Sequence, residues 1–559
     1  MSLTVQTVST TPFADQKPGT SGLRKKVKVF QQTNYLENFV QSTFNAVGES
    51  VIKGGHLVLG GDGRYFNKHA VEVILKMSAA NGVKKVTVGQ HGIFSTPAVS
   101  ATIRKLGASS GGIILTASHN PGGPDNDFGI KYNITNGGPA PEKITSAIFA
   151  QSKEIAEYKI CPDLTVDVSK IGSCSLQIEG LSSFEVEIVD SCDIYVALMK
   201  EIFNFEQIES FLKNFKLNID CLNGVTGPYA KRIFVKELKC DAKSVVNSES
   251  LEDFGGLHPD PNLTYAKSLL DMMKLGEHDF GAAFDGDGDR NMILGKNGFF
   301  VNPNDSLAVI AANQDCIPYF KNKAAAGFAR SMPTGAAVDL VAQKKGKKCF
   351  EVPTGWKFFG NLMDAGLINL CGEESFGTGS DHIREKDGIW AALAWLQILS
   401  SQSAEKQSVE KVVRGHWNEF GRNFFTRYDY EEVESSAGAK VMSNVEQQLT
   451  SLKGQSFEAM GVKYTVALAD NFSYKDPVDG SLTEKQGLRI VMMDGSRIIF
   501  RLSGTGSSGA TIRLYVDCFS SDAELFDQDS VVLKPLVEIA LKISDLVQVT
   551  GRQEPSVIT

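Results

Sequence analysis

Long apolar runs are missing from this 559-residue sequence, because none of its stretches approaches the roughly eighteen consecutive apolar residues of a membrane-spanning helix. The N-terminus also lacks a charged segment followed by an apolar one, so we expect no secretory signal and a cytoplasmic location. Nine cysteines are scattered without C-x-x-C spacing, which favours reduced thiols over a disulfide framework or a zinc site.

An excess of positive charge is missing as well. Lysine and arginine number 57 against 65 aspartates and glutamates, which gives a formal net charge of -8. Such a surface attracts neither nucleic acid nor an anionic membrane, so any anionic ligand must be held in a local basic pocket. Hydrophobic residues make up 42% of the chain and charged residues 22%, as in ordinary globular proteins.

Strand-like and helix-like segments alternate through most of the chain, a pattern typical of an α/β protein. Residues 57–64, 217–224 and 326–331 each run from an apolar strand into a polar turn that contains glycine or serine. Their similarity suggests one α/β unit used three times. After about residue 417, short strands and a closing amphipathic segment at 530–547 predict a smaller α+β domain.

The segment TASHNPGG, residues 116–123, places a serine directly after the apolar run 113–115. Glycines before the run and the NPGG turn after it are the boundaries expected of a buried strand. We therefore expect Ser118 at an accessible strand end, where it can act as a nucleophile. The alternative is a turn whose serine bonds the local backbone. Neighbouring side chains on extended backbone point apart, so we expect no relay between Ser118 and His119.

Residues 285–290, DGDGDR, carry three aspartates at alternate positions after an apolar segment. In an extended loop such positions point to one side, so three carboxylates can converge on a hard cation such as Mg²⁺ or Ca²⁺. A calcium-binding EF-hand requires glycine at the sixth position and glutamate at the twelfth, where this chain has arginine and lysine. The favoured interpretation is an Mg²⁺ ion that takes further oxygen ligands from a phosphate. The alternative is a solvated acidic turn.

Residues 501–509, RLSGTGSSG, match the G-x-G-x-x-G sequence pattern of a dinucleotide-binding loop. That loop requires a helix after the glycines, whereas residues 510–517 alternate and are β-branched, which predicts a strand. We therefore expect a strand, a loop and a strand, with hydroxyls, backbone amides and two arginines suited to a phosphate dianion. The alternative is a plain Gly/Ser hairpin.

Three further segments carry polar groups. Residues 372–377, GEESFG, offer a glutamate and a serine that suit adjacent sugar hydroxyls, and a simple polar turn is the alternative. Residues 384–388, REKDG, add cations, or form a solvated charged turn. Residues 17–26, KPGTSGLRKK, combine turn residues with bases, which fits either a second phosphate or substrate contact or a disordered basic arm.

Together and in this order, these segments resemble the α-D-phosphohexomutase superfamily, and most closely its eukaryotic-type phosphoglucomutase branch. The matching motifs are TSGLR, TASHNPGG, DGDGDR, PTGWKFF, GEESFG and RLSGTGSSGATIR, between residues 20 and 513. The resemblance implies three related α/β domains with mixed sheets and a smaller C-terminal α+β domain around a central cleft. We expect the four domains at residues 1–193, 194–302, 303–416 and 417–559.

The resemblance also implies roles for particular residues. Ser118 would carry a phosphoryl group and, with Asp285, Asp287 and Asp289, would bind the metal. Candidate proton-transfer groups are His119, Lys131 and Lys386. Candidate substrate-binding residues are Thr20, Arg24, Arg290, Thr354, Gly355, Glu373, Ser375, Arg501, Ser503, Thr505 and Arg513.

The activity implied is the reversible interconversion of glucose 1-phosphate and glucose 6-phosphate. It would use one Mg²⁺ per chain, with glucose 1,6-bisphosphate as intermediate and activator. We expect a monomer that acts on sugar phosphates without nucleic-acid or membrane partners. The alternatives are a phosphatase, a mutase for mannose or N-acetylglucosamine phosphates, and a non-catalytic scaffolding paralogue.

Overall fold

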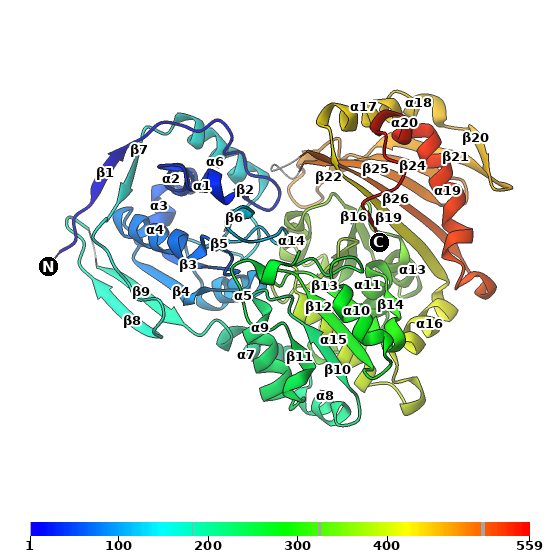
Figure 1. Ribbon diagram of the computed structural model, residues 1–559, viewed down its shortest axis with the longest axis horizontal. Helices are drawn as coiled ribbons and strands as arrows, with labels where there is room; N and C mark the ends of the chain where they lie inside the picture. Colours follow the sequence, from blue (N-terminus) through cyan, green and yellow to red (C-terminus); the bar gives the residue numbers. More distant parts are fainter. Residues whose placement is uncertain (1, 182, 322–325, 505–508) are drawn as a thin grey trace.

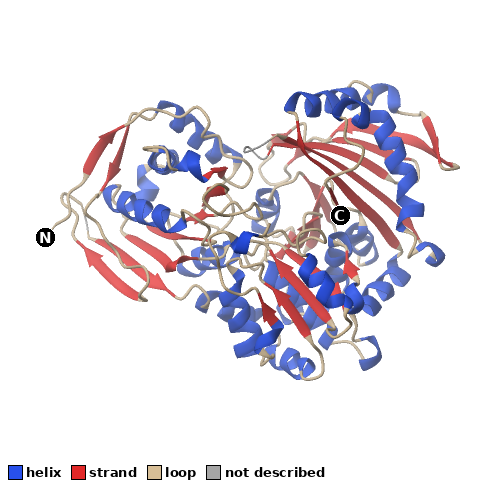
Figure 2. Ribbon diagram, viewed as in Figure 1, coloured by secondary structure: helices blue, strands red, loops and turns tan. Residues whose placement is uncertain are grey.

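The computed structural model describes residues 2–181, 183–321, 326–504 and 509–559 (Figures 1 and 2). Four larger sheets follow one another along these residues. In Figure 1 the sheet of the N-terminal part, blue to cyan, and the sheet of the C-terminal part, orange to red, lie at opposite ends of the long axis. The green and yellow-green segments lie between them.

The first sheet has seven strands in the order β2-β6-β5-β3-β4-β9-β8, and its last two strands are β9 (Phe184–Val189) and β8 (Gly172–Leu176). At its centre β3 (His56–Gly61) lies between two parallel strands, β4 (Lys85–Ile93) and β5 (Gly112–Leu115). Strand β5 then turns back into the antiparallel β6 (Asp127–Asn133), which pairs with the edge strand β2 (Leu23–Lys26). The turn between β5 and β6 carries the TASHNPGG segment.

The second sheet repeats this arrangement with five strands. Its β10 (Leu217–Asp220) lies between two parallel strands, β11 (Val245–Val246) and β12 (Phe280–Phe284). Strand β12 turns back into the antiparallel β13 (Asn291–Gly295), which pairs with β14 (Phe300–Val301). The DGDGDR segment forms the turn between β12 and β13.

The third sheet repeats the arrangement once more. Its β15 (Gly327–Ser331) lies between the parallel strands β16 (Cys349–Val352) and β17 (Ile368–Glu373). Strand β17 turns back into the antiparallel β18 (Gly377–Ser380). The GEESFG motif lies across this turn, so the same hairpin of each repeated unit carries one of the three motifs. The expected threefold use of one α/β unit is confirmed.

Helices cover these sheets. The longer ones are α2 (Tyr35–Val47), α4 (Asn67–Ala80), α5 (Thr96–Leu106), α6 (Glu142–Glu154), α7 (Asp193–Ile202), α11 (Pro303–Ala312), α13 (Ala337–Lys344), α14 (Trp356–Asp364), α15 (Gly388–Ser400) and α16 (Val409–Phe420). Helix α15 is buried from Gly388 to Leu399, so it is a core helix rather than a surface one. None of the helices in the described part of the chain is long and apolar enough to cross a membrane.

The C-terminal sheet has seven strands in the order β20-β21-β24-β25-β26-β19-β27. They are β20 (Ser456–Ala459), β21 (Val462–Asn471), β24 (Leu488–Met492), β25 (Arg497–Gly504), β26 (Ala510–Ser520), β19 (Arg422–Val433) and β27 (Val557–Ile558). All neighbouring strands of this sheet pair in the antiparallel direction. A strand follows the glycine-rich loop, so the rejection of a dinucleotide-binding loop is confirmed.

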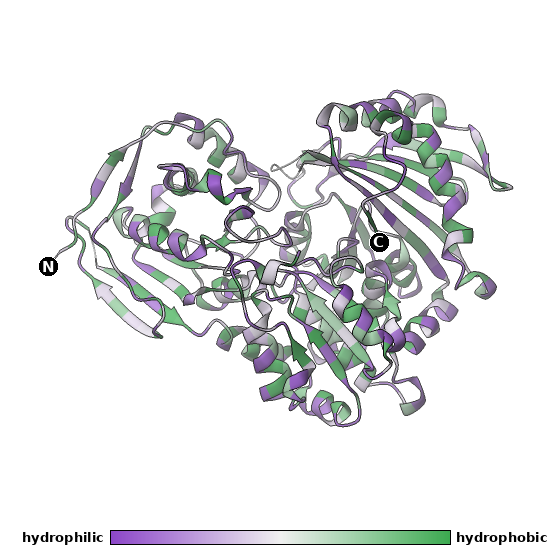
Figure 3. Cartoon of the chain, in the orientation of Figure 1, coloured by the Kyte–Doolittle hydropathy of each residue, from purple (hydrophilic) through white to green (hydrophobic). Residues whose placement is uncertain are grey.

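The two faces of this sheet differ in character. Ile498, Phe500 and Leu514 belong to a core that includes residues of α19 (Asp529–Ser544), a helix that covers most of the expected amphipathic segment at 530–547. Ile499 and Tyr515 instead pack with residues of the third sheet and of α14. Figure 3 shows hydrophobic and hydrophilic residues mixed along these strands, and the three consecutive apolar residues Ile498, Ile499 and Phe500 of β25 are all buried. Three α/β units and a C-terminal α+β unit therefore confirm the expected fold class, although the C-terminal sheet has more strands than the second and third sheets.

Candidate functional site

Ser118 lies just after the end of β5, in the turn that leads to β6. Its φ of 54° is in the left-handed region, and its backbone N–H donates to Thr116 Oγ1 at 2.7 Å. Its Oγ lies 3.0 Å from Asp285 Oδ2 of the metal-loop motif. The prediction that Ser118 follows the end of a strand is confirmed. The prediction that it is accessible is wrong, because the neighbouring loops leave Ser118 only 3% exposed.

His119 corrects a second expectation about this turn. Its Nδ1 lies 3.3 Å from Ser118 Oγ, so the two side chains do not point apart. The left-handed backbone of Ser118 is the reason, since the alternation of side chains holds only for extended backbone. Burial, followed by the charges of Arg290 and Arg24, holds the pKa of His119 well below its usual value. Burial and these charges therefore favour the neutral imidazole.

Arg64 holds the backbone of the Ser118 turn. Its guanidinium donates to the carbonyl oxygens of Ser118 at 2.7 Å, Asn120 at 3.2 Å and Asp127 at 3.0 Å. Its Nε lies 2.9 Å from Asp62 Oδ2, and both side chains are fully buried. The sequence singled out the GGDGR turn only as part of a repeat, so this function of Arg64 was missed.

The three aspartates of DGDGDR converge. Asp285, Asp287 and Asp289 each place one carboxylate oxygen within 4.8 Å of a carboxylate oxygen of the other two. All three residues are buried. The segment forms a turn rather than the extended loop that we expected. Thr96 Oγ1 donates to Asp287 Oδ2 at 2.6 Å, and the N–H of Arg290 donates to Asp285 Oδ1 at 3.0 Å.

These carboxylates fit a divalent cation. The Oδ1 atoms of Asp287 and Asp289 are buried and accept no hydrogen bond from any described residue. Burial and the charges of the two neighbouring aspartates raise the pKa of Asp285 well above its usual value. A hard cation with oxygen ligands would relieve both conditions, since it replaces the missing partners and neutralises the repulsion.

Both candidate lysines are held by buried carboxylates. Lys131, on β6, donates to Glu385 Oε1 at 3.1 Å, and Asn133 donates to the same oxygen at 2.8 Å. Lys386 Nζ lies 3.2 Å from Asp289 Oδ2. Glu385 was not singled out as a site residue, although it belongs to the REKDG segment. This segment is therefore buried and paired rather than a solvated charged turn.

The GEESFG turn meets both the PTG segment and the metal loop. The N–H of Gly355 donates to Glu373 Oε1 at 3.2 Å, and the Oγ1 of Thr354 is buried with no partner in the described part of the chain. Arg290 forms an antiparallel bridge with Gly377. A Cβ on Gly377 would lie 2.4 Å from Cδ of Lys386, so glycine permits this close approach. Ser375 is 9% exposed.

The N-terminal basic segment is ordered against β6. The φ of Gly22 is 89°, and a Cβ there would lie 2.5 Å from Cβ of Lys131, so the turn packs closely on this strand. Arg24 follows in β2, opposite Gly129. Burial lowers the pKa of Arg24, and the charge of Asp287 acts against this. Thr20 lies in an exposed turn nearby.

Two arginines face each other at the far end of the site. Arg501 on β25 lies opposite Arg513 on β26. Arg501 Nη1 lies 3.5 Å from the hydroxyl of Tyr515, and Arg513 Nε lies 3.7 Å from Asp429 Oδ1. Burial lowers the pKa of Arg513, but the charge of Asp429 outweighs it and the pKa is raised. Ser503 is half-buried, and Thr505 lies outside the described residues.

Four family profiles match consecutive parts of the chain. Those described as "Phosphoglucomutase/phosphomannomutase, alpha/beta/alpha domain" I, II and III match residues 15–159, 193–298 and 302–420. The profile described as "Phosphoglucomutase-1, C-terminal domain" matches residues 422–556.

Relatives align along the whole chain. Phosphoglucomutase-1 of Oryctolagus cuniculus is 58% identical and covers 99% of this chain and 100% of its own. Phosphoglucomutase 1 of Drosophila melanogaster is 57% identical, with 100% of both chains covered. A protein named "Probable phosphoglucomutase, cytoplasmic 2" of Arabidopsis thaliana is 55% identical, again with 100% of both covered.

Solved structures share the architecture. The open form of pp63/parafusin, a phosphoglucomutase from Paramecium, gives a TM-score of 0.90 at 49% sequence identity and covers 100% of both chains. A phosphomannomutase homologue from Thermus thermophilus gives a TM-score of 0.67 at 21% identity and covers 95% of this chain and 100% of its own. The second likeness bears on the fold alone.

Proposed function

Since the chain belongs to the phosphoglucomutase/phosphomannomutase family, we propose that it interconverts glucose 1-phosphate and glucose 6-phosphate. One observation carries this proposal. The hydroxyl of Ser118 lies 3.0 Å from the aspartate cluster, while the facing arginines 501 and 513 lie on a separate sheet. A reacting phosphate and a second, non-reacting phosphate can thus be bound at once.

The reaction proceeds by two phosphoryl transfers. Phosphorylated Ser118 gives its phosphoryl group to the 6-hydroxyl of glucose 1-phosphate, so the serine O–P bond breaks and the sugar O–P bond forms. The resulting glucose 1,6-bisphosphate turns round and returns its 1-phosphate to Ser118. Ser118, Asp285, Asp287 and Asp289 would hold one Mg²⁺ per chain, which would supply positive charge near the transferred group. His119, Lys131 and Lys386 are the candidate groups for the accompanying proton transfers.

The remaining residues bind and orient the sugar phosphate. Glu373 and Ser375 would accept and donate hydrogen bonds with sugar hydroxyls, because their turn lies beside the metal loop. Guanidinium and hydroxyl groups would hold the phosphate that is not reacting. These groups belong to Arg501, Ser503, Thr505 and Arg513. Further contacts are assigned to Thr20, Arg24, Arg290, Thr354 and Gly355.

The binding of a second phosphate separates a mutase from a phosphatase. Hydrolysis at Ser118 requires only one phosphate to be held, whereas a bisphosphate intermediate has two. We extend the proposal to a cytoplasmic monomer with domains at residues 1–193, 194–302, 303–416 and 417–559. Glucose 1,6-bisphosphate would act as its activator as well as its intermediate.

The test is a coupled assay of Ser118→Ala with glucose 1-phosphate, Mg²⁺ and a trace of the bisphosphate. Loss of the nucleophile is expected to lower the rate by more than about 10³-fold. Mass spectrometry should place phosphate on Ser118 of the unmodified protein. Ser109→Ala, at the other end of β5, serves as the control and should keep its activity. Full activity of Ser118→Ala would refute the proposal, and faster turnover of mannose 1-phosphate would refute the glucose assignment.

A further inference from the structure

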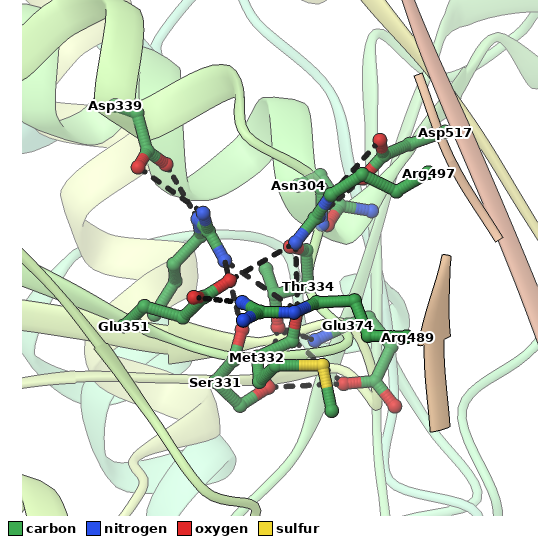
Figure 4. A network of polar contacts seen from close by, with 12 residues as sticks. Asn304, Ser331, Met332, Thr334, Asp339, Glu351, Glu374, Arg489, Arg497 and Asp517 are labelled. Atoms are coloured by element: carbon green, nitrogen blue, oxygen red, sulfur yellow. Dashed lines mark hydrogen bonds and ion pairs between the residues drawn. The ribbon is translucent and has the colours of Figure 1, made fainter. Parts of the chain in front are cut away.

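Arg497 is a buried arginine at the start of β25, where the C-terminal sheet meets the third sheet. Its five N–H groups all have acceptors: Asp517 accepts from Nε and Nη2, Glu351 and the Met332 carbonyl from Nη1, and the Thr334 carbonyl from Nη2. Figure 4 shows the side chain reaching from Asp517 to the turn that holds Met332 and Thr334. Asp517 is on its own sheet, and the other three acceptors belong to the third unit.

The turn that accepts from Arg497 also holds the GEESFG motif. Thr334 receives the Arg497 bond on its carbonyl at 2.7 Å, and its Oγ1 accepts from the N–H of Glu374 at 2.9 Å. The carboxylate of Glu374 is also within 3.4 Å of the Thr334 hydroxyl and 3.3 Å of the Ser331 hydroxyl. Glu374 lies between the two candidate sugar-binding residues, Glu373 and Ser375. One residue, Thr334, therefore joins Arg497 to the sugar-binding turn.

On the other side, Arg497 is on the same strand as a candidate phosphate ligand. Arg497 and Arg501 are four positions apart on β25, so they share a face and lie about 13 Å apart along the strand. Opposite them on β26 are Asp517 and Arg513. A buried guanidinium with all its donors used fixes this strand pair against the third unit, because any shift would break several charge-assisted bonds at once.

We propose that Arg497 is a positioning residue that sets the distance between the phosphate-binding arginines and the sugar-binding turn, an inference that rests on the function proposed above. Substrate must contact both groups together. A small displacement of one against the other weakens binding and can lower the rate up to about 10²-fold, even from a residue that never touches substrate.

Arg489 provides a matched control at the same boundary. Its Nη1 donates to Glu351 Oε2 at 2.7 Å, so it shares a carboxylate with Arg497. Its Nε and Nη2 donate to Asp470, at 3.1 and 2.9 Å, rather than to the turn that holds Thr334. Burial by itself raises the pKa of Glu351. The charges of Arg330, Arg497 and Arg489 outweigh burial, so this pKa is below its usual value. Both arginines thus stabilise the boundary, while only Arg497 bonds the turn that holds Thr334.

The experiment compares Arg497→Lys with Arg489→Lys in the full chain. We measure KM and kcat for glucose 1-phosphate by the coupled assay, and the thermal midpoint of each variant. Lysine keeps the charge but has three donors instead of five. Arg497→Lys should raise KM about tenfold, and Arg489→Lys should leave KM within about twofold at a similar loss of thermal stability. Equal KM changes in the two variants would overturn the proposal.

A second pair of variants tests the link through Thr334 without altering the arginine. Thr334→Val removes the hydroxyl that accepts from Glu374 and should raise KM as Arg497→Lys does. Thr334→Ser keeps the hydroxyl and should restore the original KM. A normal KM for Thr334→Val would contradict the proposed path. If the unmodified protein turns over no glucose 1-phosphate, the function proposed above fails, and the same variants are compared by calorimetric binding of that ligand, which tests the positioning separately.

Discussion

The two ends of the site are built differently. At the reacting end, polar groups bind one another: Ser118, Arg64 and Asp285 are 3%, 0% and 0% exposed. At the distal end, Arg501 and Ser503 are half-buried, and Arg513 Nε has no hydrogen-bond partner in the described ranges. The serine turn at the first end is held by hydrogen bonds within the protein, whereas an arginine at the second end keeps a donor available for a ligand.

This difference follows from what each end must do. A group that transfers phosphoryl must be oriented before the transition state, since reorganisation at that moment adds to the barrier. A group that holds the non-reacting phosphate must bind and release it in two orientations of the sugar. Interactions of that second kind change ground-state and transition-state binding equally, so they alter KM more than kcat. The predictions below test this division.

The largest effect is expected at the aspartate cluster. Asp287→Asn removes one of three carboxylates available to the metal and should lower kcat by about 10³-fold, because several kcal/mol of charge stabilisation is lost. Chelation of divalent cations from the unmodified protein should abolish activity, and added Mg²⁺ should restore it. Asp279→Asn, at the opposite end of β12 from the aspartate cluster, is the control. Unchanged turnover in a chelator would contradict a metal-dependent reacting end.

Arg64 is expected to have the next largest effect. Arg64→Lys keeps a charge beside Asp62 but cannot reach three carbonyls and a carboxylate together. We expect kcat to fall about 10²-fold from misplacement of Ser118, with KM nearly unchanged. The free energy of unfolding should fall by about 3 kcal/mol, as for other broken buried pairs.

Two variants of Thr116 test whether the hydrogen bonds of this residue position Ser118 in the same turn. Thr116 Oγ1 accepts from the N–H of Ser118 and donates to Asp62 Oδ2 at 2.6 Å. Thr116→Ser should keep both bonds and most of the activity, whereas Thr116→Val should lower kcat. If KM rather than kcat changed in Arg64→Lys and Thr116→Val, the reacting end would not be preorganised as described.

Local patterns in the sequence were enough to predict the hairpins and their motifs. Hydrophobic patterns indicate which side chains a strand buries. The apolar run 113–115 and the alternating residues 510–517 both lie in strands, as predicted. The polar, glycine-containing turns mark where the hairpin loops can bend. Repetition of the unit was also visible, because each copy contains the same sequence of strand and turn.

Partners distant in the sequence could not be predicted in this way. Lys131 bonds Glu385, 254 positions away, and neither residue carries a local signal for the other. The prediction that Ser118 is accessible was wrong for the same reason, since the loops that cover this residue come from other units. The left-handed φ of Ser118 was missed too, because non-glycine residues seldom adopt it. Tertiary contacts decide each of these features.

The distal end should respond in KM. Arg501→Lys removes a guanidinium fork that suits a phosphate and should raise KM about tenfold, with kcat changed less than about threefold. Leu502→Ala, the next position on the strand and on the opposite face, is the control and should leave KM unchanged. Isothermal titration with glucose 1-phosphate measures the same loss as an affinity. A fall in kcat without a rise in KM would show that this end also acts in the transition state.

The smallest effect is expected where two units meet through exposed charge. Lys357 on α14 forms an ion pair with Glu142 on α6, whose side chain is 77% exposed. Solvent and salt screen such a pair, so Glu142→Gln should change the free energy of unfolding by less than about 1 kcal/mol and the rate by less than about twofold. The measurement is denaturant unfolding with the coupled assay at low and high salt. A loss as large as that of Arg64→Lys would mean that burial does not distinguish the bonds that position this site from those that merely lie near it.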